Sequence, residues 1–464
     1  MKTLILAGGR GTRLFPLSRS HFPKQFLQYF EGESLFQKTL RRALLFSAPD
    51  EVTVVTSADH RFLVMDQMKG VGAECRVLVE PEGKNTLPAV LYGLKHAVDD
   101  EEHVAVFPSD HLVETDETYG AAMKAAGRLA EEYLVTFGVP PRSPQTGYGY
   151  IRPGTRVEGG YRVDAFVEKP DLQTAEQYIK DGFLWNSGMF LFNTRLFFEE
   201  CRHCIPEALS AFEKSTEEAF RLTPAISVDY GVMERTKRAA VVPLTSAWSD
   251  VGSFDAFYAL AEKDGKGNVV HGEHLGIDGG NNLIVSDRLV ATIGVSEMAI
   301  VDTRDVLLVC PKAEAQRVGE IVGTLQTRGD ARCESHTTVF RPWGSYTLLE
   351  SGPSFSIKRI TVLPGRRLSL QLHHHRSEHW VVVRGTALVS NNGERFFVRS
   401  GESTYVPAGV KHRLENPGLI PLEVIEVQNG EHITEDDIVR YDDDFKREKQ
   451  PEKRPTVLCT HTIH

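Results

Sequence analysis

A glycine-rich segment near the N-terminus has the composition of a phosphate-binding loop. The apolar run Leu4–Ala7 is followed at once by the segment GGRGTR at residues 8–13, and Lys24 comes soon after. Glycines let the backbone approach a ligand closely, and successive amide groups in such a loop attract anions. Arg10, Arg13 and Lys24 add positive charge. The sequence therefore predicts a polyphosphate cradle at the carboxyl end of a buried strand.

Two better-known phosphate-binding motifs are excluded here. A P-loop requires Gly-Lys-Ser or Gly-Lys-Thr after four spacer residues, and no such sequence follows Gly8. A dinucleotide fingerprint requires a third glycine at the position that Leu14 occupies. The loop therefore belongs to another class of phosphate site.

Two aspartates follow other apolar runs and are candidates for a metal site. Asp110 comes after His103–Phe107, and Asp250 comes after Ala239–Leu244. Burying a carboxylate is costly unless it is paired or binds a metal. Mg²⁺ in polyphosphate chemistry prefers one or two carboxylates together with phosphate oxygens. The pair predicts a Mg²⁺ site, while either aspartate alone is also compatible with a helix cap or a turn.

A third candidate site lies in the C-terminal third of the chain, where histidines are dense. The segment QLHHHRSEHW spans residues 371–380, and its surroundings reproduce the spacing of the two metal-binding motifs of cupin barrels, with glutamine in place of the first histidine. A histidine run can be a solvated patch, but two motifs with matching spacing predict a metal centre. The residues that fit are Gly365, Gln371, His373, Glu378, Gly385, Gly401, Pro407, Gly409, His412 and Asn416.

Strand geometry explains how four of these residues would converge on a metal. Residues two apart on a strand face the same side, so Gln371 and His373 both point into the barrel. We expect Glu378 to lie at or beyond the end of that strand and His412 to come from the facing hairpin. One Gln, one Glu and two His suit Zn²⁺ or another divalent metal. His375 is the main rival ligand.

The hydrophobic pattern of the N-terminal part alternates between short apolar runs and amphipathic stretches. The expected strands are Thr3–Ala7, Val52–Thr56, Arg76–Val79, His103–Phe107 and Leu134–Phe137. The expected helices are Ser34–Phe46, His60–Met68, Thr86–His96 and Tyr119–Glu132. This alternation predicts an α/β, Rossmann-like domain with a mixed, mostly parallel sheet that helices cover on both faces. Ligands then bind at the carboxyl ends of the strands.

Composition divides the chain into three domains and a tail. Residues 1–262 carry the alternating pattern of an α/β domain. Residues 263–330 are rich in glycine and short β runs, which predicts a small β-rich connector. Residues 331–447 are predicted to form a cupin β-barrel, and residues 448–464 a charged, loosely ordered tail.

Composition also bounds the class of protein. The formal net charge of −10 argues against a nucleic-acid binder. No apolar run is long enough for a membrane span, and the N-terminus does not have the pattern of a secretory signal. The six cysteines fit neither a disulfide framework nor a four-ligand zinc motif. We therefore expect a cytoplasmic protein with reduced thiols.

The motif GGRGTRLFPLSR, followed by Pro23 and Lys24, resembles the signature of sugar-nucleotide pyrophosphorylases and is most similar to the mannose-1-phosphate guanylyltransferase branch. The resemblance implies that the loop binds GTP and that segments 108–111 and 248–253 form the Mg²⁺ and phosphate site. The implied nucleotide-binding residues are Gly8, Gly9, Gly11, Thr12, Arg13, Lys24, Glu80, Asn85, Thr86, Ser109 and Asp110. The implied catalytic residues are Arg13, Lys24, Asp110 and Asp250.

Three further segments, at residues 146–151, 167–170 and 185–189, resemble the sugar-1-phosphate pocket of the same family. On sequence alone, each is interpreted as a loop. They offer glycine and aromatic groups for a sugar face, an acceptor and a cation for hydroxyls and phosphate, and an amide. The implied sugar-phosphate-binding residues are Gly147, Tyr148, Glu168, Lys169 and Asn186.

The segment PGRRLSLQLHHHRSEHW at residues 364–380 resembles the type II phosphomannose isomerase domain, which is typically fused behind such a guanylyltransferase. The resemblance implies that mannose 6-phosphate and fructose 6-phosphate are interconverted through an enediol, with a metal as Lewis acid. Arg376 is the expected catalytic partner of phosphate or enediolate, and Arg413 is a second candidate. The proton carrier is left open among His375, His379 and Glu402.

The expected function is therefore the synthesis of GDP-mannose from GTP and mannose 1-phosphate, with release of pyrophosphate and with a second, isomerase activity on mannose 6-phosphate. Such a product feeds polysaccharide biosynthesis. One alternative changes the nucleotide or the sugar. Another makes the cupin domain a non-catalytic sugar-binding or regulatory module. No nucleic-acid or membrane partner is expected, and a homodimer is left open.

Overall fold

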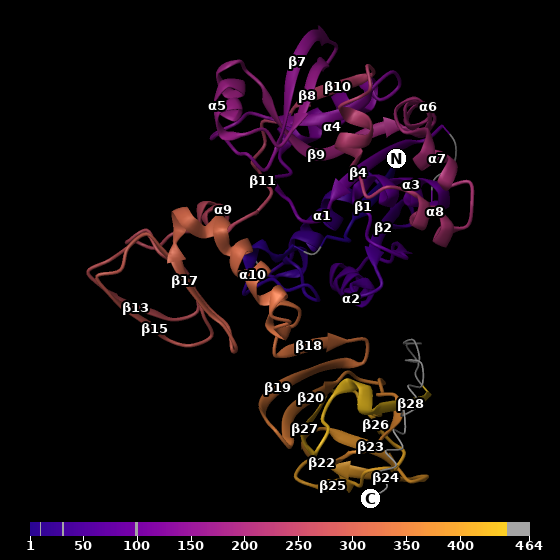
Figure 1. The fold of residues 1–464 in the computed structure, drawn as a ribbon, viewed down its shortest axis with the longest axis vertical. Helices are drawn as coiled ribbons and strands as arrows, with labels where there is room; N and C mark the ends of the chain where they lie inside the picture. Colours follow the sequence, from indigo (N-terminus) through magenta and orange to yellow (C-terminus); the bar gives the residue numbers. More distant parts are fainter. Residues whose placement is uncertain (10, 30–31, 98–100, 443–464) are drawn as a thin grey trace, which may run out of the picture. The chain divides into compact units, whose positions relative to one another are not determined.

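The computed structural model describes residues 1–9, 11–29, 32–97 and 101–442 (Figure 1). The chain forms two compact units, of which the first is Met1–Ser335 and the second begins at His336. Arg10 and the predicted tail at 448–464 therefore lie outside the described residues. None of the helices in the described ranges is long and apolar enough to cross a membrane.

The first unit is built on a nine-stranded mixed sheet with the strand order β3-β2-β1-β4-β9-β6-β10-β8-β7 (Figure 1). Its strands are β1 (Lys2–Leu6), β2 (Val52–Ser57), β3 (Arg76–Glu80), β4 (His103–Pro108), β6 (Leu134–Val139), β7 (Gly149–Val157), β8 (Gly160–Glu168), β9 (Leu184–Asn193) and β10 (Ala239–Pro243). β1 to β4 are mutually parallel, as are β6 and β10. β9 lies antiparallel between β4 and β6, and β7 and β8 form an antiparallel edge.

Helices cover both faces of this sheet, as predicted, because each face has its own apolar core. α1 (Leu35–Ala43), α2 (Arg61–Val71) and α4 (Glu117–Leu129) pack on one face, where Phe36, Val64 and Tyr119 are buried. The other face carries α3 and α6 to α8. Their bounds are α3 (Thr86–Ala97), α6 (Thr194–Cys204), α7 (Pro206–Ala211) and α8 (Thr216–Leu222), and the short α5 (Leu172–Lys180) follows β8.

The predicted strands and helices of this domain are confirmed to within a few residues, but the three predicted loops of the sugar pocket are wrong. Residues 149–151, 167–168 and 185–189 belong to β7, β8 and β9. In β9 the side chains of Trp185, Ser187 and Met189 are buried, while Asn186 between them is only partly covered. The polar residues on the uncovered side of the strand gave these segments the composition of loops.

The connector is a small coil in which β12 to β16 pair in parallel and β17 pairs antiparallel with β16. The chain passes alternately between a sheet of β12, β14, β16 and β17 and a sheet of β13 and β15. The strands are β12 (Val269–His271), β13 (His274–Ile277), β14 (Leu283–Val285), β15 (Val290–Ile293), β16 (Met298–Asp302) and β17 (Leu307–Pro311). One apolar core joins this coil to α9 (Phe254–Leu260), to α10 (Val318–Thr327) and to Leu14 and Leu17, which follow the glycine loop. The connector therefore supports that loop.

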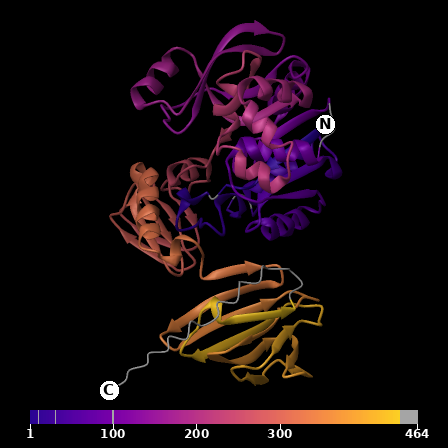
Figure 2. The same ribbon diagram turned by 45° about the vertical axis from the view of Figure 1, so that its right-hand side comes forward.

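The second unit consists of two facing sheets, drawn from orange to yellow in Figure 2. One has the order β18-β19-β20-β27-β22-β25 and the other β24-β23-β26-β21-β28. Trp343, Val362 and Trp380 belong to the core between them. The strands are β18 (Thr338–Arg341), β19 (Gly344–Gly352), β20 (Phe355–Val362), β21 (Leu370–His373), β22 (Arg376–Arg384), β23 (Thr386–Asn391), β24 (Glu394–Arg399), β25 (Ser403–Val406), β26 (His412–Glu415), β27 (Leu422–Gly430) and β28 (Ile438–Asp442). This is the predicted cupin barrel.

Candidate active sites

A short two-stranded ladder brings the two predicted Mg²⁺ ligands into one site. β5 (Leu112–Val113) follows Asp110, and β11 (Trp248–Ser249) precedes Asp250; the two strands pair antiparallel. Lys24 lies between the aspartates, with Nζ 3.1 Å from Asp110 Oδ2 and donating to the backbone oxygen of Asp250. Three residues far apart in sequence thus form one charged cluster.

The Lys24 ammonium is almost fully covered, with 8% of its side chain exposed. Burial alone would raise the pKa of Asp110, but the charges of Lys24 and His111 hold that pKa below its usual value. Asp110 is therefore an ionised carboxylate at neutral pH. Together with Asp250, it offers the hard oxygen donors that Mg²⁺ prefers. The donor set thus fits the predicted metal.

Close packing explains two of the three glycines in the phosphate loop. A Cβ on Gly8 would lie 2.4 Å from Glu80 Oε1. Gly11 has φ +48°, and its Cβ would lie 2.9 Å from Lys24 Cγ. A Cβ on Gly9 would meet no described atom within 4 Å, although the Gly9 backbone oxygen accepts from Gln25 Nε2 at 2.8 Å. The neighbouring Arg13 is exposed and Thr12 half-buried.

The predicted nucleotide-binding residues Glu80, Asn85 and Thr86 belong to the segment that leads from β3 into the helix α3. Burial raises the pKa of Glu80 to about 7. Asn85 has φ +72°, and its Oδ1 accepts from the backbone N–H of Thr86, 2.9 Å away. Thr86 Oγ1 accepts from the backbone N–H of Val228 at 2.9 Å. Ser109 is buried at the end of β4. Asn85 and Thr86 therefore shape the loop through these contacts.

Aromatic rings surround Tyr148 beside the charged cluster. Its hydroxyl donates to Asp250 Oδ1 at 2.5 Å, and its ring packs edge-on against Trp185 and Trp248. Burial and the charge of Asp250 raise the pKa of Tyr148, while Arg13 opposes this shift. The sugar-pocket segments and the glycine loop therefore meet around Tyr148. A Cβ on Gly147, just before it, would meet no described atom within 4 Å.

Glu168 and Lys169 lie at the end of β8 and Asn186 near the start of β9, and β7 pairs with both strands. Burial, followed by the charge of Asp229, raises the pKa of Glu168 to about 7. Lys169 Nζ lies 3.6 Å from Glu168 Oε1. Asn186 Nδ2 donates to Asp229 Oδ1 at 2.7 Å. Sequence reasoning left Asp229 unassigned because it lies 43 residues from Asn186.

Several buried polar atoms around this pocket have no hydrogen-bond partner among the described residues. Buried donors and acceptors are normally paired, so unpaired ones concentrated at one place mark a site that a ligand completes. They are His111 Nδ1, Glu168 Oε2, Trp185 Nε1 and Trp248 Nε1.

Arg19 belongs to the signature motif, but its side chain contacts the connector and not the phosphate loop. Its side chain is buried and forms a bidentate pair with Asp305 of the connector, at 2.9 and 3.0 Å. It also donates to the backbone oxygens of Pro16, Arg332 and Ser335. Arg19 thus fastens the segment after the glycine loop to the connector. The buried charge requires an anion, but nothing in the sequence identified Asp305.

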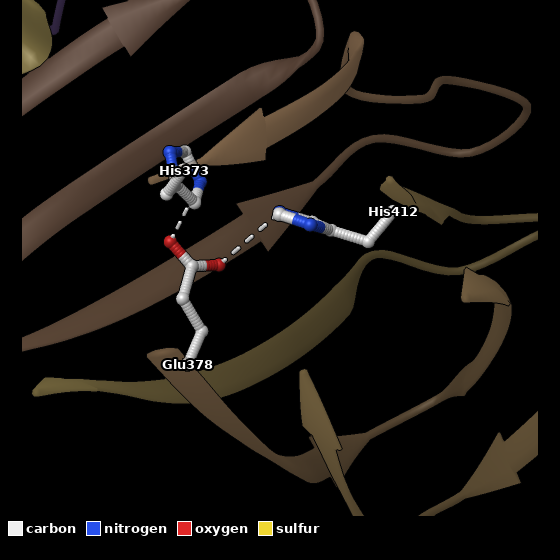
Figure 3. A group of neighbouring side chains, drawn as sticks. All are labelled: His373, Glu378 and His412. Carbon is white, nitrogen blue, oxygen red and sulfur yellow. Dashed lines mark ion pairs between the residues drawn. The ribbon is translucent and has the colours of Figure 1, made fainter. Parts of the chain in front are cut away.

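In the cupin domain, His373, Glu378 and His412 form a buried triad (Figure 3). Their ligand atoms lie within 4.8 Å of one another. His373 Nε2 is 3.1 Å from Glu378 Oε1, and His412 Nε2 is 3.6 Å from Glu378 Oε2. All three side chains are 1% exposed. Such a group could hold a metal ion.

The protonation of the triad suits metal binding. The ring of His412 uses Nδ1 toward the backbone oxygen of Val410 at 2.9 Å, and its buried Nε2 has no hydrogen bond in the described structure. A backbone partner on one ring nitrogen leaves the lone pair of the other for a metal. Burial lowers the pKa of His412. Burial alone would raise the pKa of Glu378, but His373, then His412 and Arg376, bring it far below its usual value.

The strands that carry the predicted metal ligands are arranged differently from the expectation. His412 is not on a facing hairpin: β26 pairs with β21 in the same sheet, with His412 directly opposite Gln371. Glu378 comes from β22 in the other sheet. β21 ends at His373, so His375 leaves the strand face, lies 63% exposed and contacts Asp437 at 2.8 Å. His375 is therefore wrong as a rival ligand.

Gln371, the predicted fourth ligand, lies beside the triad, with Nε2 3.5 Å from His373 Nε2. Arg376 is buried there too, and its guanidinium contacts Glu378 Oε1 at 3.3 Å and His373 Nε2 at 3.4 Å. Arg413 instead pairs with Asp442, 2.5 Å away, and does not line the cavity that Gln371, Arg376 and Glu378 line. Arg376 is thus the arginine near the predicted metal.

That cavity also bears on the open question of the proton carrier. Gln371, Arg376 and Glu378 line it. Neither His379 nor Glu402 is a lining residue in the described structure, and both are exposed. The exposed His375 is absent from the lining as well. The three candidates therefore lie away from this cavity, and the proton carrier stays unassigned.

Three family models match the chain. The nucleotidyl transferase model matches residues 2–267, the beta-helix domain model of MannoseP isomerase/GMP-like proteins matches residues 272–325, and the mannose-6-phosphate isomerase C-terminal model matches residues 328–443. The first covers more than half of the chain.

Relatives align with nearly the whole chain. The chain is 42% identical to the xanthan biosynthesis protein XanB of Xanthomonas campestris pv. campestris strain B100, over 96% of this chain and 98% of that one. It is 41% identical to the alginate biosynthesis protein AlgA of Pseudomonas aeruginosa, over 97% and 98%. A crystal structure described as a mannose-1-phosphate geranyltransferase from Thermus thermophilus matches 70% of this chain and 99% of that one, with 37% identity and a TM-score of 0.64. The chain therefore belongs to the family of bifunctional mannose-1-phosphate guanylyltransferases and mannose-6-phosphate isomerases.

Proposed function

We propose that the N-terminal domain joins GTP and mannose 1-phosphate into GDP-mannose and releases pyrophosphate. The sugar phosphate attacks the α-phosphorus of GTP, so catalysis consists mainly of positioning and charge stabilisation. Arg13 and Lys24 offset the charge of the triphosphate beside Gly8, Gly9 and Gly11. Glu80, Asn85, Thr86 and Ser109 border the nucleotide.

We assign the sugar 1-phosphate to the pocket around Tyr148. The Tyr148 ring offers an apolar face for the sugar, and Gly147 leaves room beside it. Glu168 and Asn186 supply acceptors and donors for hydroxyls, and Lys169 supplies a cation for the phosphate. The unpaired polar atoms of Trp185, Trp248 and Glu168 support this assignment because a sugar offers them partners.

Asp110 and Asp250 would hold Mg²⁺ in this site. When bound, the ion would neutralise charge on the phosphates as the α-phosphorus is attacked. The chain's own contribution is to keep both carboxylates at one place, since Lys24 contacts both residues. This contact is the observation that carries the proposal.

In the cupin domain we propose that a divalent metal, Zn²⁺ or one of similar chemistry, binds to Gln371, His373, Glu378 and His412. When bound, it would polarise the sugar carbonyl as a Lewis acid. Arg376 stabilises negative charge on the enediolate, because its guanidinium lies against two of the ligands. The reaction is the interconversion of mannose 6-phosphate and fructose 6-phosphate.

Assays with the purified chain test these functions. We expect GTP with mannose 1-phosphate to give the highest turnover in a panel of nucleotides and sugar 1-phosphates. Higher turnover with UTP or dTTP would contradict the guanylyl assignment. If the metal-loaded full chain cannot convert mannose 6-phosphate, the cupin domain is a binding or regulatory module instead.

The domain limits at 262, 330 and 447 and a cytoplasmic location remain proposals. The described cysteines are free thiols, which suits a reducing compartment. Light scattering would test whether the chain forms a homodimer.

A further inference from the structure

The cavity of the cupin domain extends from the metal site into a region lined by both cations and carboxylates, the latter being Glu378, Glu426 and Glu435. Its empty space amounts to about 530 Å³ when the open mouth is counted. Gln371 and Glu378 line it on the metal side. Its basic lining residues are Arg341, Lys358, Arg376 and Arg440.

Two of these four cations, Arg376 and Arg440, already have carboxylate partners. Arg376 contacts Glu378 and His373, and its Nη1 donates to the backbone oxygen of Thr434 at 2.9 Å. No ion pair is found for Arg341 or Lys358 among the residues that the structure describes, and both cations lie over the ring of Tyr346, at 5.8 and 5.3 Å from its centre. These two charges are therefore available to a ligand.

Strand register directs two of the cations into the cavity. Lys358 on β20 lies opposite Glu426 on β27, and Glu426 lies opposite Trp380 of the core. Arg440 on β28 lies opposite Gln371, the predicted metal ligand. Residues that face each other across strands project from the same side of a sheet. Lys358 and Arg440 therefore project from the two opposed sheets into one space.

The carboxylates of the cavity do not satisfy these cations. Glu378 contacts the two triad histidines and Arg376, and Glu426 accepts from Trp380 Nε1 at 3.1 Å. Glu435 accepts from Nη2 of Arg440, but the buried Nε of Arg440 has no hydrogen-bond partner in the described structure. A buried donor without a partner is unfavourable. Glu426 and Glu435 thus leave Arg440 Nε without an acceptor.

We propose that Arg341, Lys358 and Arg440 bind the phosphate of the hexose 6-phosphate. The proposal rests on the isomerase function and extends it. In a hexose 6-phosphate the reacting C1 and C2 lie at the opposite end of the carbon chain from the phosphate. With C1 and C2 at the metal end, the phosphate reaches these three cations, and its binding energy holds the reacting carbons in place.

Kinetics of Lys358→Met test the proposal. Loss of a charge-assisted hydrogen bond raises KM for mannose 6-phosphate roughly ten- to hundredfold, and we expect inhibition by inorganic phosphate to weaken in parallel. Arg440→Met should act in the same direction. Metal content must stay unchanged, since Arg440 neighbours Gln371. Arg359→Met is the matched control, because Arg359 is the exposed neighbour of Lys358 on β20. The retained metal and the circular dichroism spectrum of each variant report on folding of the cupin domain.

Calorimetry with mannose 6-phosphate separates this proposal from the isomerase function. If the unaltered protein binds the sugar phosphate without converting it, and Lys358→Met and Arg440→Met abolish binding, the phosphate site stands and the isomerase function fails. If the unaltered protein converts it and both variants keep the same KM, binding and inhibition by phosphate, the proposal is overturned.

Discussion

The two candidate sites are built on opposite principles. In the N-terminal domain, the carboxylates lie just outside strand ends, and Lys24 contacts both Asp110 and Asp250. Polar atoms around that site have no partners in the described chain. In the cupin domain, His373, Glu378 and His412 lie on strands between two sheets and are almost fully buried. One site is left open for its substrates to complete, whereas the other is nearly complete without them.

This difference has a consequence for metal binding. Two carboxylates alone make a weak Mg²⁺ site, because Mg²⁺ retains waters and takes further oxygens from substrate phosphates. Nitrogen and carboxylate ligands held rigidly in a buried barrel make a tight site for Zn²⁺ or a similar metal. We therefore expect Mg²⁺ to bind and dissociate together with GTP, whereas the cupin metal should remain bound.

The largest expected effect separates the two activities. Asp110→Asn removes one of the two carboxylates beside Lys24, so guanylyltransferase kcat should fall by about 10²–10³-fold, as for the loss of one transition-state charge contact. Isomerase activity should be unchanged. Asp66→Asn, at an exposed position of α2, is the control. A parallel loss of both activities would show that the sites are not independent.

The reciprocal variant is His412→Ala. Removal of one triad ligand should lower isomerase activity by at least about 10²-fold through loss of the metal, with guanylyltransferase activity retained. His379→Ala, an exposed histidine on the strand that carries Glu378, should keep both activities. Loss of isomerase activity in His379→Ala would instead restore this residue as a candidate proton carrier.

A third prediction concerns the attachment of the phosphate loop to the connector. Arg19→Met leaves Asp305 unpaired and should lower the free energy of unfolding of the first unit by about 3–5 kcal/mol. In a double-mutant cycle, Asp305→Asn should lower the free energy of unfolding much less in the Arg19→Met variant than in the unaltered protein. Urea unfolding of the four proteins measures this coupling, and additive losses would contradict it.

The smallest expected effect is a pH-dependent gain in stability. The pKa of Glu80 is about 7 in the folded protein, against 4.5 for an ordinary glutamate. Between these values the folded state binds more protons than the unfolded state, so stability falls as the pH rises and levels off above pH 7. Glu80→Gln removes this penalty.

Melting temperatures of Glu80→Gln from pH 4.5 to pH 8 check this expectation. The variant should gain up to about 3 kcal/mol at pH 8, and the gain should vanish near pH 4.5. Glu82→Gln is the control, because Glu82 is an exposed neighbour. A gain that is the same at every pH would exclude titration of Glu80 as the cause.

The sequence predicted those features whose chemically informative residues lie close together in the chain or at a fixed spacing. A buried run followed by glycines marks the phosphate loop after β1, and fixed spacing identified the cupin triad. Contacts between distant residues had no such signal. Arg19 with Asp305 and Asn186 with Asp229 are joined only by the folded chain. Spacing also could not show that Glu378, and not His412, comes from the opposite sheet, because strand order is set by long-range pairing.

Metal content of the purified full chain tests the central contrast most directly. Protein expressed without added metal and dialysed against buffer should retain about one transition metal per chain and no stoichiometric Mg²⁺. Asp110→Asn should retain the transition metal, and His412→Ala should lose it. Retention of the metal by His412→Ala, or its loss from Asp110→Asn, would contradict the account of one open and one preformed site.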